Sequence, residues 1–571
     1  LGQVREVLGR AAGDGQGTAR RGRGTSGLSA PMADVSAEVA VSIVDERLAE
    51  ETAPLVEQLV AERVGSRLAG RDHTLWGPEA EAEARIRLAW TDLHETSRPL
   101  LAEIEALRAE LRAEGLDRIV LAGMGGSSLA PEVITRTAGV ALVVLDTTDP
   151  GQVADALAGD LNRTVLVVSS KSGTTVETDS HRRIFEKAFG DNGIDPASRI
   201  VVVTDPGSPL DEAATAAGYR RVFRADPNVG GRYSALTAFG LVPSGLAGAD
   251  VAALLDEAAA AAPLLSVDSA ENPALRLACA IGAAHARGAE KVVLADTGSG
   301  IKGFGDWAEQ LIAESTGKNG TGVLPVVVEG PDAPGFADAG SDATAVAIGK
   351  PEGAARLGTD GPLGGLMLLW EYATAVTGRL LAINPFDQPD VEAAKKAARA
   401  LLDAPTAETG RPVLVDGPVE VYAAEGLLPA GTQTLAEALR ALLDSAPEHG
   451  YLSVQVYLDR IEDASAIVLR TELARRSGLQ TTFGWGPRFL HSTGQYHKGG
   501  HQNAVFLQLT GAVEHDLEVP GRPYTLGTLQ HAQALGDGQV LIEHGRPLLR
   551  LHLTDRLAGI AHVVRVIQEV E

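Results

Sequence analysis

The 571-residue chain contains very little cysteine and few aromatic side chains. Cys279 is its one cysteine, and Phe, Tyr and Trp together make up 4% of the residues. A single cysteine excludes an internal disulfide and a metal site built from several thiolates, as is typical of proteins in a reducing compartment. No apolar run approaches the ~18 residues that a membrane span requires. We therefore expect a soluble, cytoplasmic protein with no membrane partner.

Positive charge is also scarce, and lysine especially so. The formal net charge is −25, and nine lysines stand against 41 arginines. Such an acidic balance disfavours nonspecific binding to nucleic acid, so an anionic ligand needs its own local cluster of donors. Three of the lysines, Lys171, Lys318 and Lys395, lie in Gly/Ser/Thr-rich or Pro-bounded segments, where a flexible cation can meet a phosphate or a hydroxyl.

The length predicts three or four domains. We interpret residues 1–31, rich in Gly and Arg without apolar periodicity, as a disordered extension, and residues 32–114 as a helical layer with apolar residues at helical spacing from Val39 and Ile43 onward. Apolar runs then alternate with helix-length segments, as is typical of a parallel sheet covered on both faces. We predict an α/β fold with two doubly wound sheets, in residues 115–262 and 263–402, and a further α/β region in residues 403–571. The predicted strands are 119–122, 141–145, 165–168, 200–204, 222–223, 291–295, 323–328, 344–348, 413–415, 419–423, 451–458, 504–509 and 549–553.

The run that ends at residue 168 opens into a cluster of hydroxyl side chains around one lysine. Ser170, Lys171, Ser172, Thr174 and Thr175 follow a β-branched strand and precede a segment that can begin a helix. Short hydroxyls, a close-packed glycine and a helix N-terminus together favour an anion such as a sugar phosphate. The alternative is a Ser/Thr turn that caps a helix, which would explain one or two of these residues but not all of them.

A glycine turn follows the first strand of the first sheet. Gly125, Gly126, Ser127 and Ser128 lie between a strand and a helix, where open α/β sheets bind ligands. The turn is an imperfect G-x-G-x-x-G, with Asp146 near the spacing of a ribose ligand, so a dinucleotide site and a purely structural turn are alternatives. The two hydroxyls favour a polyol or a phosphate.

Two segments offer groups for acid–base chemistry. Gly231 frees the backbone beside Arg232, whose planar cation can stabilise a developing oxyanion or pair with surface acids instead. Gln310 and Glu314 lie four apart on a helix that ends at a glycine, so they share one face. The C-terminal position of Glu314 is expected to raise its pKa toward that of a useful general base. The alternative is a solvated helix face, a role for which Glu309 is the better candidate.

Two further segments carry candidate residues. Lys395 follows a Pro-bounded turn and lies inside a helix, where an exposed lysine is the ordinary case. His491, His497 and His501 lie in a loop with glycines on both sides. A metal site, a proton-transferring or substrate-binding histidine and a packed loop are all possible there, and we expect no metal because the glycines spoil helical ligand geometry and no acidic ligand lies nearby.

Together these segments resemble the glucose-6-phosphate isomerase family from about residue 117 to residue 402. The resemblance implies two sugar-isomerase domains and reversible isomerisation of glucose 6-phosphate and fructose 6-phosphate through a cis-enediolate, with no cofactor or metal. It implies a proton-transferring base at Glu314, an enediolate contact at Arg232 and a sugar-ring contact at Lys395. The substrate-binding residues that it implies are Gly125, Gly126, Ser127, Ser170, Lys171, Ser172, Thr175, Gly231 and Gln310.

One departure from the family pattern concerns its ring-opening histidine. The family places that histidine between the glutamate and the lysine, whereas residues 315–394 contain none. We predict His497 as the substitute, because residues 494–497 resemble part of the histidine motif. The region from about residue 403 resembles the C-terminal portion of actinobacterial isomerases that are elsewhere fused to a transaldolase, and no transaldolase activity is expected here.

The isomerase function implied by the resemblance has two alternatives. The family resemblance implies a hexose phosphate as ligand and makes a homodimer possible. An isomerase that also accepts mannose 6-phosphate is one alternative, because the same enediol chemistry serves either C2 epimer. A sugar-phosphate sensor without turnover is the other, because it shares the phosphate site but needs no catalytic base.

Overall fold

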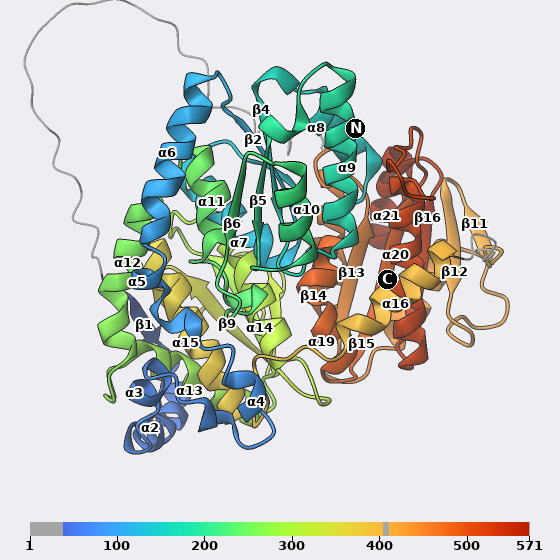
Figure 1. Ribbon diagram of the computed structural model, residues 1–571. Coiled ribbons are helices and arrows are strands. Elements are labelled where there is room, and N and C mark those ends of the chain that lie inside the picture. The colour runs from blue at the N-terminus through green and yellow to red at the C-terminus, as the bar shows by residue number, and fades with distance from the viewer. Residues whose placement is uncertain (1–37, 404–409, 570–571) are drawn as a thin grey trace, which may run out of the picture. The chain divides into compact units, whose positions relative to one another are not determined.

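The computed structural model describes residues 38–403 and 410–569 (Figure 1). The extension predicted for residues 1–31 therefore lies outside the described residues. Within the described ranges the chain forms three sheets, each covered by helices, which confirms the predicted α/β class. No helix in these ranges has the length and hydrophobicity needed to cross a membrane.

The first sheet is entirely parallel, with the strand order β3-β2-β4-β5-β6. Its strands are β2 (Arg118–Gly123), β3 (Val143–Leu145), β4 (Thr164–Ser169), β5 (Ile200–Thr204) and β6 (Arg221–Arg224). Alternate residues of β2 and β4 pack into apolar clusters on opposite faces, so the sheet is buried on both sides. Helix α11 (Ala238–Ala247) packs on one side, and α9 (Val176–Asp191) and α10 (Pro209–Ala217) pack on the other.

The strand order reverses between β2 and β4. The chain moves from β2 to β3 on one side and then crosses to β4 on the other side of β2. The loops that follow β2 and β4 therefore flank the crevice in which open α/β sheets bind ligands. The glycine turn and the hydroxyl cluster noted in the sequence are those two loops.

The second sheet has the order β1-β10-β9-β7-β8. Strands β7 (Lys291–Asp296), β8 (Leu324–Val327), β9 (Ala343–Ile348) and β10 (Leu357–Asp360) are parallel, and β1 (Ala40–Ile43) joins the edge antiparallel to β10. The helix-like spacing of Val39 and Ile43 was therefore misleading at the start of the N-terminal layer. Val39 and Val41 are the buried residues, which is the alternation of a strand.

The third sheet has the order β11-β12-β16-β15-β13-β14. Its strands are β11 (Leu414–Asp416), β12 (Val419–Ala423), β13 (Tyr451–Tyr457), β14 (Gln480–Trp485), β15 (Ala504–Gly511) and β16 (Leu548–Leu553). The apolar face packs on α17 (Leu435–Asp444), α18 (Val468–Ser477) and α21 (Arg556–Glu569). The other face carries Ser453, Gln455 and Gln508 and is covered by α20 (Leu526–Glu543).

The remaining helices join these sheets into one body. Tyr451 and Phe506 of the third sheet share an apolar cluster with Val293 and Val326 of the second, so the C-terminal region packs directly against the rest of the chain. The other helices are α2 (Glu46–Ala61), α3 (Val64–Ala69), α4 (Glu81–Ala84), α5 (Leu93–Thr96), α6 (Pro99–Ala113), α7 (Leu129–Ala138), α8 (Pro150–Ala158), α12 (Val251–Leu265), α13 (Pro273–Ala286), α14 (Phe304–Thr316), α15 (Leu363–Leu380), α16 (Val391–Asp403) and α19 (Gly494–Gly499). Short 3₁₀ turns are η1 (His73–Trp76), η2 (Ala89–Asp92), η3 (Gly125–Ser127), η4 (Leu161–Arg163), η5 (Pro196–Ser198), η6 (Gly231–Tyr233), η7 (Ala464–Ile467) and η8 (Arg488–His491).

Candidate active site

The hydroxyl cluster forms a compact loop between β4 and the N-terminus of α9. Ser170 Oγ lies 3.1 Å from Thr175 Oγ1, and Ser172 Oγ lies 2.9 Å from Thr174 Oγ1. The backbone N–H of Gly173 donates to Ser170 Oγ at 3.1 Å. The hydroxyls thus bond to one another around the first turn of α9, where a helix favours an anion.

Lys171 supplies the positive charge of this loop. Its Nζ lies 2.6 Å from Asp205 Oδ2 at the end of β5 and donates to the carbonyl of Pro227 at 3.3 Å. Burial raises the pKa of Asp205 even though Lys171 opposes that shift. Lys171 is therefore paired with Asp205, a carboxylate whose charged form is disfavoured by burial.

The glycine turn after β2 lies directly against the segment that carries Arg232. A Cβ atom at Gly126 would lie 2.0 Å from the carbonyl oxygen of Gly231, and one at Gly125 would lie 2.8 Å from both Gln310 Nε2 and the His491 carbonyl oxygen. Only residues without a side chain permit these approaches. The two glycines therefore bring four segments of the chain to one point.

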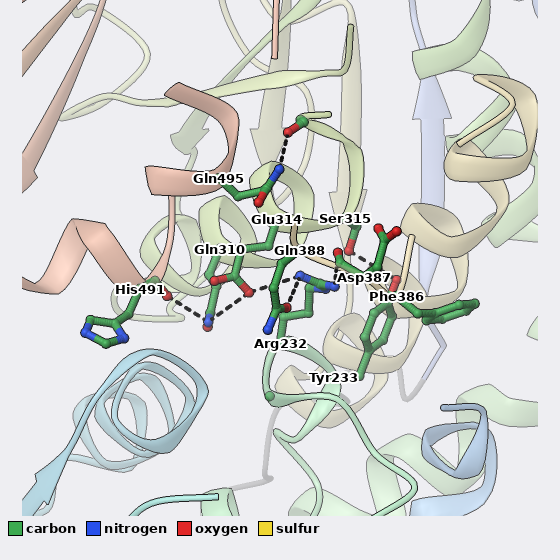
Figure 2. A network of polar contacts seen from close by, with 12 residues as sticks. Arg232, Tyr233, Gln310, Glu314, Ser315, Phe386, Asp387, Gln388, His491 and Gln495 are labelled. Atoms are coloured by element: carbon green, nitrogen blue, oxygen red, sulfur yellow. Dashed lines mark hydrogen bonds and ion pairs between the residues drawn. The ribbon is translucent and has the colours of Figure 1, made fainter. Parts of the chain in front are cut away.

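A buried network of polar side chains lies beside this turn (Figure 2). Arg232 is 3% exposed, and its guanidinium donates to Glu314 Oε2 at 3.2 Å and to Gln388 Oε1 at 3.0 Å. It also donates to the Asp387 carbonyl at 2.9 Å, and Gln310 Nε2 lies 3.4 Å from Glu314 Oε2. The carboxylate thus has an arginine on one side and an amide on the other.

Glu314 has a raised pKa, as the sequence predicted, but for a different reason. Burial is the main cause, and the nearby charges of Arg232 and His491 together with hydrogen bonds from Gln310 and Arg232 oppose it. The helix terminus that the sequence analysis invoked is not among these causes. A carboxyl whose charge is disfavoured by burial and favoured by its neighbours is suited to accept and return a proton.

A histidine and a carboxylate form a pair on the other side of the network. His491, at the end of η8, places Nε2 3.0 Å from Oε1 of Glu177, in the first turn of α9. Burial alone would raise the pKa of Glu177, but the His491 ring, its hydrogen bond and a backbone N–H lower that pKa to about 2. An ionised carboxylate only accepts hydrogen bonds, so His491 Nε2 carries a proton and Nδ1 is the ring nitrogen that can exchange one with a ligand.

These segments enclose a cavity of about 520 Å³, a volume within the range of small-molecule sites. Of the residues predicted from sequence, all the substrate-binding ones line it, as do Glu314 and Lys395: Gly125, Gly126, Ser127, Ser170, Lys171, Ser172, Thr175, Gly231 and Gln310. Arg232 lies just behind the cavity wall through its contact with Glu314. Lys395 Nζ lies 2.8 Å from Glu392 Oε1, and its side chain is half exposed.

The structure does not bring His497 to this cavity. The His497 side chain is 1% exposed, with Nδ1 3.0 Å from the Tyr451 hydroxyl and the ring stacked on that of Tyr451. Burial, with Lys498 and Arg546 nearby, lowers its pKa well below the usual value. His497 is thus a neutral core histidine, and the correction to the sequence prediction is that His491, six residues earlier in the same loop, is the histidine that lines the cavity.

Asp146 and Lys318, which the sequence singled out, are both buried. Asp146, the possible ribose ligand, is buried with Oδ2 3.0 Å from the guanidinium of Arg488, so it does not face a dinucleotide. Lys318 is buried, and its Nζ donates to two carbonyls of the 384–388 turn, those of Asn384 and Asp387, at 2.7 and 2.6 Å. Among the residues that the structure describes, no three or more His, Cys, Asp or Glu side chains gather as a metal site.

Several cavity residues were not chosen from the sequence. Glu177 and His491 lie in segments that the sequence analysis had marked, so their residue types were a usable signal. Gln388 lies within the Pro-bounded turn before Lys395. Lys498 and Gln533 line the cavity from the C-terminal region, and nothing in their local sequence distinguishes them.

Comparison with known proteins agrees with this geometry. Residues 104–327 match the family model described as phosphoglucose isomerase. A glucose-6-phosphate isomerase of Symbiobacterium thermophilum is 31% identical over 398 residues, which are 56% of this chain and 88% of that protein. The chain belongs to the phosphoglucose isomerase family.

Two further relatives extend the comparison. The glucose-6-phosphate isomerase of Rubrobacter xylanophilus is 30% identical over 390 residues, covering 55% of this chain and 88% of that protein. A crystal structure of a glucose-6-phosphate isomerase from Chlamydia trachomatis shares the fold, with a TM-score of 0.52 and 22% identity over 65% of this chain and 89% of that chain. The family model includes Arg232 and Glu314, whereas His491 and Gln533 lie beyond its last matched residue.

Proposed function

We propose that this member of the phosphoglucose isomerase family interconverts glucose 6-phosphate and fructose 6-phosphate by aldose–ketose isomerisation. The observation that carries the proposal is the buried Glu314 carboxyl, 3.2 Å from the Arg232 guanidinium and at the wall of a cavity that the hydroxyl loop also lines. A proton-transferring base, a fixed cation and an anion site are the three elements that this reaction needs.

The phosphate group binds at the loop between β4 and α9. Its oxygens accept hydrogen bonds from the hydroxyls of Ser170, Ser172 and Thr175 and from the first N–H groups of α9, and Lys171 adds a charge. Gly125, Gly126 and Ser127 face the same cavity and allow the sugar to approach the backbone closely.

Ring opening is assigned to His491 with help from Lys395. The pyranose hydroxyl at C1 loses a proton while the ring oxygen gains one, so a group that both accepts and donates is required. His491 Nδ1 meets this need because Glu177 fixes Nε2 as a donor. The ammonium of Lys395, on the first turns of α16, supplies a second donor to the sugar.

Proton transfer is assigned to Glu314. The carboxylate removes the proton from C2 of the open aldose, and the carboxyl delivers a proton to C1 while the hydroxyl proton of O2 passes to O1. The reverse reaction uses the same atoms in the opposite order. Negative charge develops on the oxygens of the cis-enediolate in between. The planar cation of Arg232, held by Gln388 and the Asp387 carbonyl, stabilises that charge.

The test is fructose 6-phosphate turnover by the wild type, Glu314→Gln and Glu309→Gln. Glu309 lies on the same helix but does not line the cavity, so it provides a matched control. We expect Glu314→Gln to lose at least 10²-fold in kcat and Glu309→Gln to stay close to wild type. Near-full turnover by Glu314→Gln would refute the mechanism.

The same assay separates the alternatives. Turnover of mannose 6-phosphate at a comparable rate would identify an isomerase with dual specificity. Binding of fructose 6-phosphate without any turnover by the wild type would identify a sensor. The buried base beside a buried arginine supports catalysis rather than binding alone.

The proposed catalytic groups all lie on one chain. His491 comes from the C-terminal region, and Glu314 and Arg232 come from the central part, so we infer that a single subunit carries a full set. The homodimer suggested by the family resemblance is tested by light scattering at assay concentrations. A cytoplasmic location is proposed from the low cysteine content of the sequence alone.

A further inference from the structure

Helix α20 brings a glutamine from the C-terminal region into the wall of the cavity. Gln533 is 4% exposed, and its Nε2 donates to Glu177 Oε1 at 2.7 Å. Its Oε1 accepts a hydrogen bond from the Thr148 hydroxyl at 2.8 Å, in the loop between β3 and α8. Both ends of the amide are therefore engaged, and each end contacts a different element of the first α/β unit.

The oxygen that Gln533 contacts is the one that faces the histidine. Glu177 Oε1 lies 2.7 Å from Gln533 Nε2 and 3.0 Å from His491 Nε2. Because the carboxylate only accepts, the amide must present its NH₂ group to Glu177, and its oxygen then accepts from the Thr148 hydroxyl. The amide thus fixes the position of a carboxylate that in turn fixes the ring.

Helix α20 also packs against α16, which carries Lys395. Helices α16 and α20 pack against each other, and a Cβ atom at Gly536 would lie 2.7 Å from the backbone nitrogen of Ala398. Gly536 is three residues after Gln533, so both contacts come from one turn of α20. Helix α20 lies outside the region of the family model. One turn of it contacts both Glu177, which pairs with His491, and α16, which carries Lys395.

We propose that Gln533 is a positioning residue for ring opening, an inference that rests on the proposed isomerase function. Gln533 acts through Glu177 on His491 and touches no reacting atom. Without its N–H donor the carboxylate loses one of its fixed partners, and His491 loses the orientation in which Nδ1 meets the sugar. Proton transfer between C1 and C2 by Glu314 does not depend on this contact.

The experiment isolates ring opening by removing the later step. In the Glu314→Gln protein, exchange between the α and β anomers of glucose 6-phosphate requires only opening and closing of the ring, and NMR exchange spectroscopy measures its rate. Gln533→Met is added to this background. Gln530→Met is the matched control, because Gln530 lies on the same helix, is also 4% exposed, and has no partner for Nε2 among the described residues.

We expect Gln533→Met to slow enzyme-catalysed anomer exchange by about ten-fold, the size of one charge-assisted hydrogen bond, and Gln530→Met to leave it unchanged. With Glu314 intact, Gln533→Met should lower kcat with little change in KM.

Three results would overturn the proposal. Anomer exchange that Gln533→Met and Gln530→Met slow equally would indicate a loss of packing in α20. An unchanged anomer-exchange rate and an unchanged kcat in Gln533→Met, with a melting temperature like that of the wild type, would remove Gln533 from the pathway. Absence of anomer exchange in the Glu314→Gln protein would show that ring opening needs Glu314 itself. Failure of the wild type to isomerise fructose 6-phosphate would instead refute the proposed function.

Discussion

Two separate substitutions, His491→Gln and His497→Gln, test the assignment of ring opening to His491. His491 lines the cavity and His497 lies in the core, only six residues away. Glutamine at position 491 keeps an N–H donor near Glu177 but cannot exchange a proton at neutral pH. We therefore expect His491→Gln to lose at least 10²-fold in kcat, the usual contribution of a general acid–base group. The free energy of unfolding should change by less than about 1 kcal/mol.

His497→Gln should show the opposite pattern. The His497 ring stacks on Tyr451 and meets Phe506 edge-on, with centroids 5.9 and 5.4 Å apart, and its Nδ1 contacts the Tyr451 hydroxyl. Loss of this packing should lower the free energy of unfolding by about 2 kcal/mol. Turnover per folded molecule should match that of the wild type.

The pH dependence of stability gives a second readout for His497. Its pKa in the folded protein lies well below the ordinary 6.5 because the ring is buried. Below pH ~6.5 the unfolded chain therefore binds a proton that the folded chain does not, and the folded state loses up to about 1.4 kcal/mol per pH unit. His497→Gln should lack this loss, so the variant and the wild type should converge in stability between pH 6.5 and 5.

The assays are coupled turnover of fructose 6-phosphate and urea unfolding at pH 7 and pH 5. The reasoning fails if His497→Gln is inactive at wild-type stability while His491→Gln remains active. It also fails if the two variants lose stability to the same extent and both retain turnover, because the cavity histidine would then have no part in the chemistry.

Three other substitutions test separate parts of the structure. Lys171→Met removes the charge beside the phosphate loop and should raise KM for fructose 6-phosphate about ten-fold with little change in kcat, as steady-state kinetics would show; an unchanged KM would place the phosphate elsewhere. Gly126→Ala puts a methyl group 2.0 Å from the Gly231 oxygen, so kcat/KM should fall more than about ten-fold, and normal kinetics would contradict the close approach. Arg488→Met removes the guanidinium that lies 2.6 Å from Glu132 and 3.0 Å from Asp146 and leaves them only Arg460, at 2.8 and 3.6 Å, which should lower the free energy of unfolding by about 3 kcal/mol in urea; a loss below about 1 kcal/mol would mean that Arg460 alone compensates both carboxylates.

The central sheets could be predicted from the sequence because their strands are buried on both faces. Residues 119–122, 165–168 and 200–203 are continuously apolar, and they lie in β2, β4 and β5. The hydroxyl loop and the glycine turn, which line the cavity, were also predictable, because their residues are consecutive in the chain. Local sequence was sufficient wherever one segment carried the chemistry by itself.

Elements whose role depends on distant partners could not be predicted from the sequence. Strand β1 is four residues long and pairs antiparallel at a sheet edge, and β14 carries Gln480, Thr481 and Thr482, so neither has a continuous apolar run. The choice between His491 and His497 depends on which side of a loop meets α9 and which meets β13. The contact between Gln533 and Glu177 spans 356 positions, and no local pattern encodes it.

The most direct test of the account follows hydrogen in D₂O. Fructose 6-phosphate is converted in D₂O by the wild type and by Glu314→Gln, and NMR measures deuterium at C2 of the glucose 6-phosphate formed. Proton transfer through Glu314 and an enediolate predicts deuterium at C2 with the wild type, because the carboxyl exchanges its proton with solvent, and negligible conversion with Glu314→Gln. Full conversion by the wild type with no deuterium at C2, even after many turnovers, would fit hydride transfer between the carbons and would contradict a base that exchanges its proton with solvent, and full conversion by Glu314→Gln would contradict the account directly.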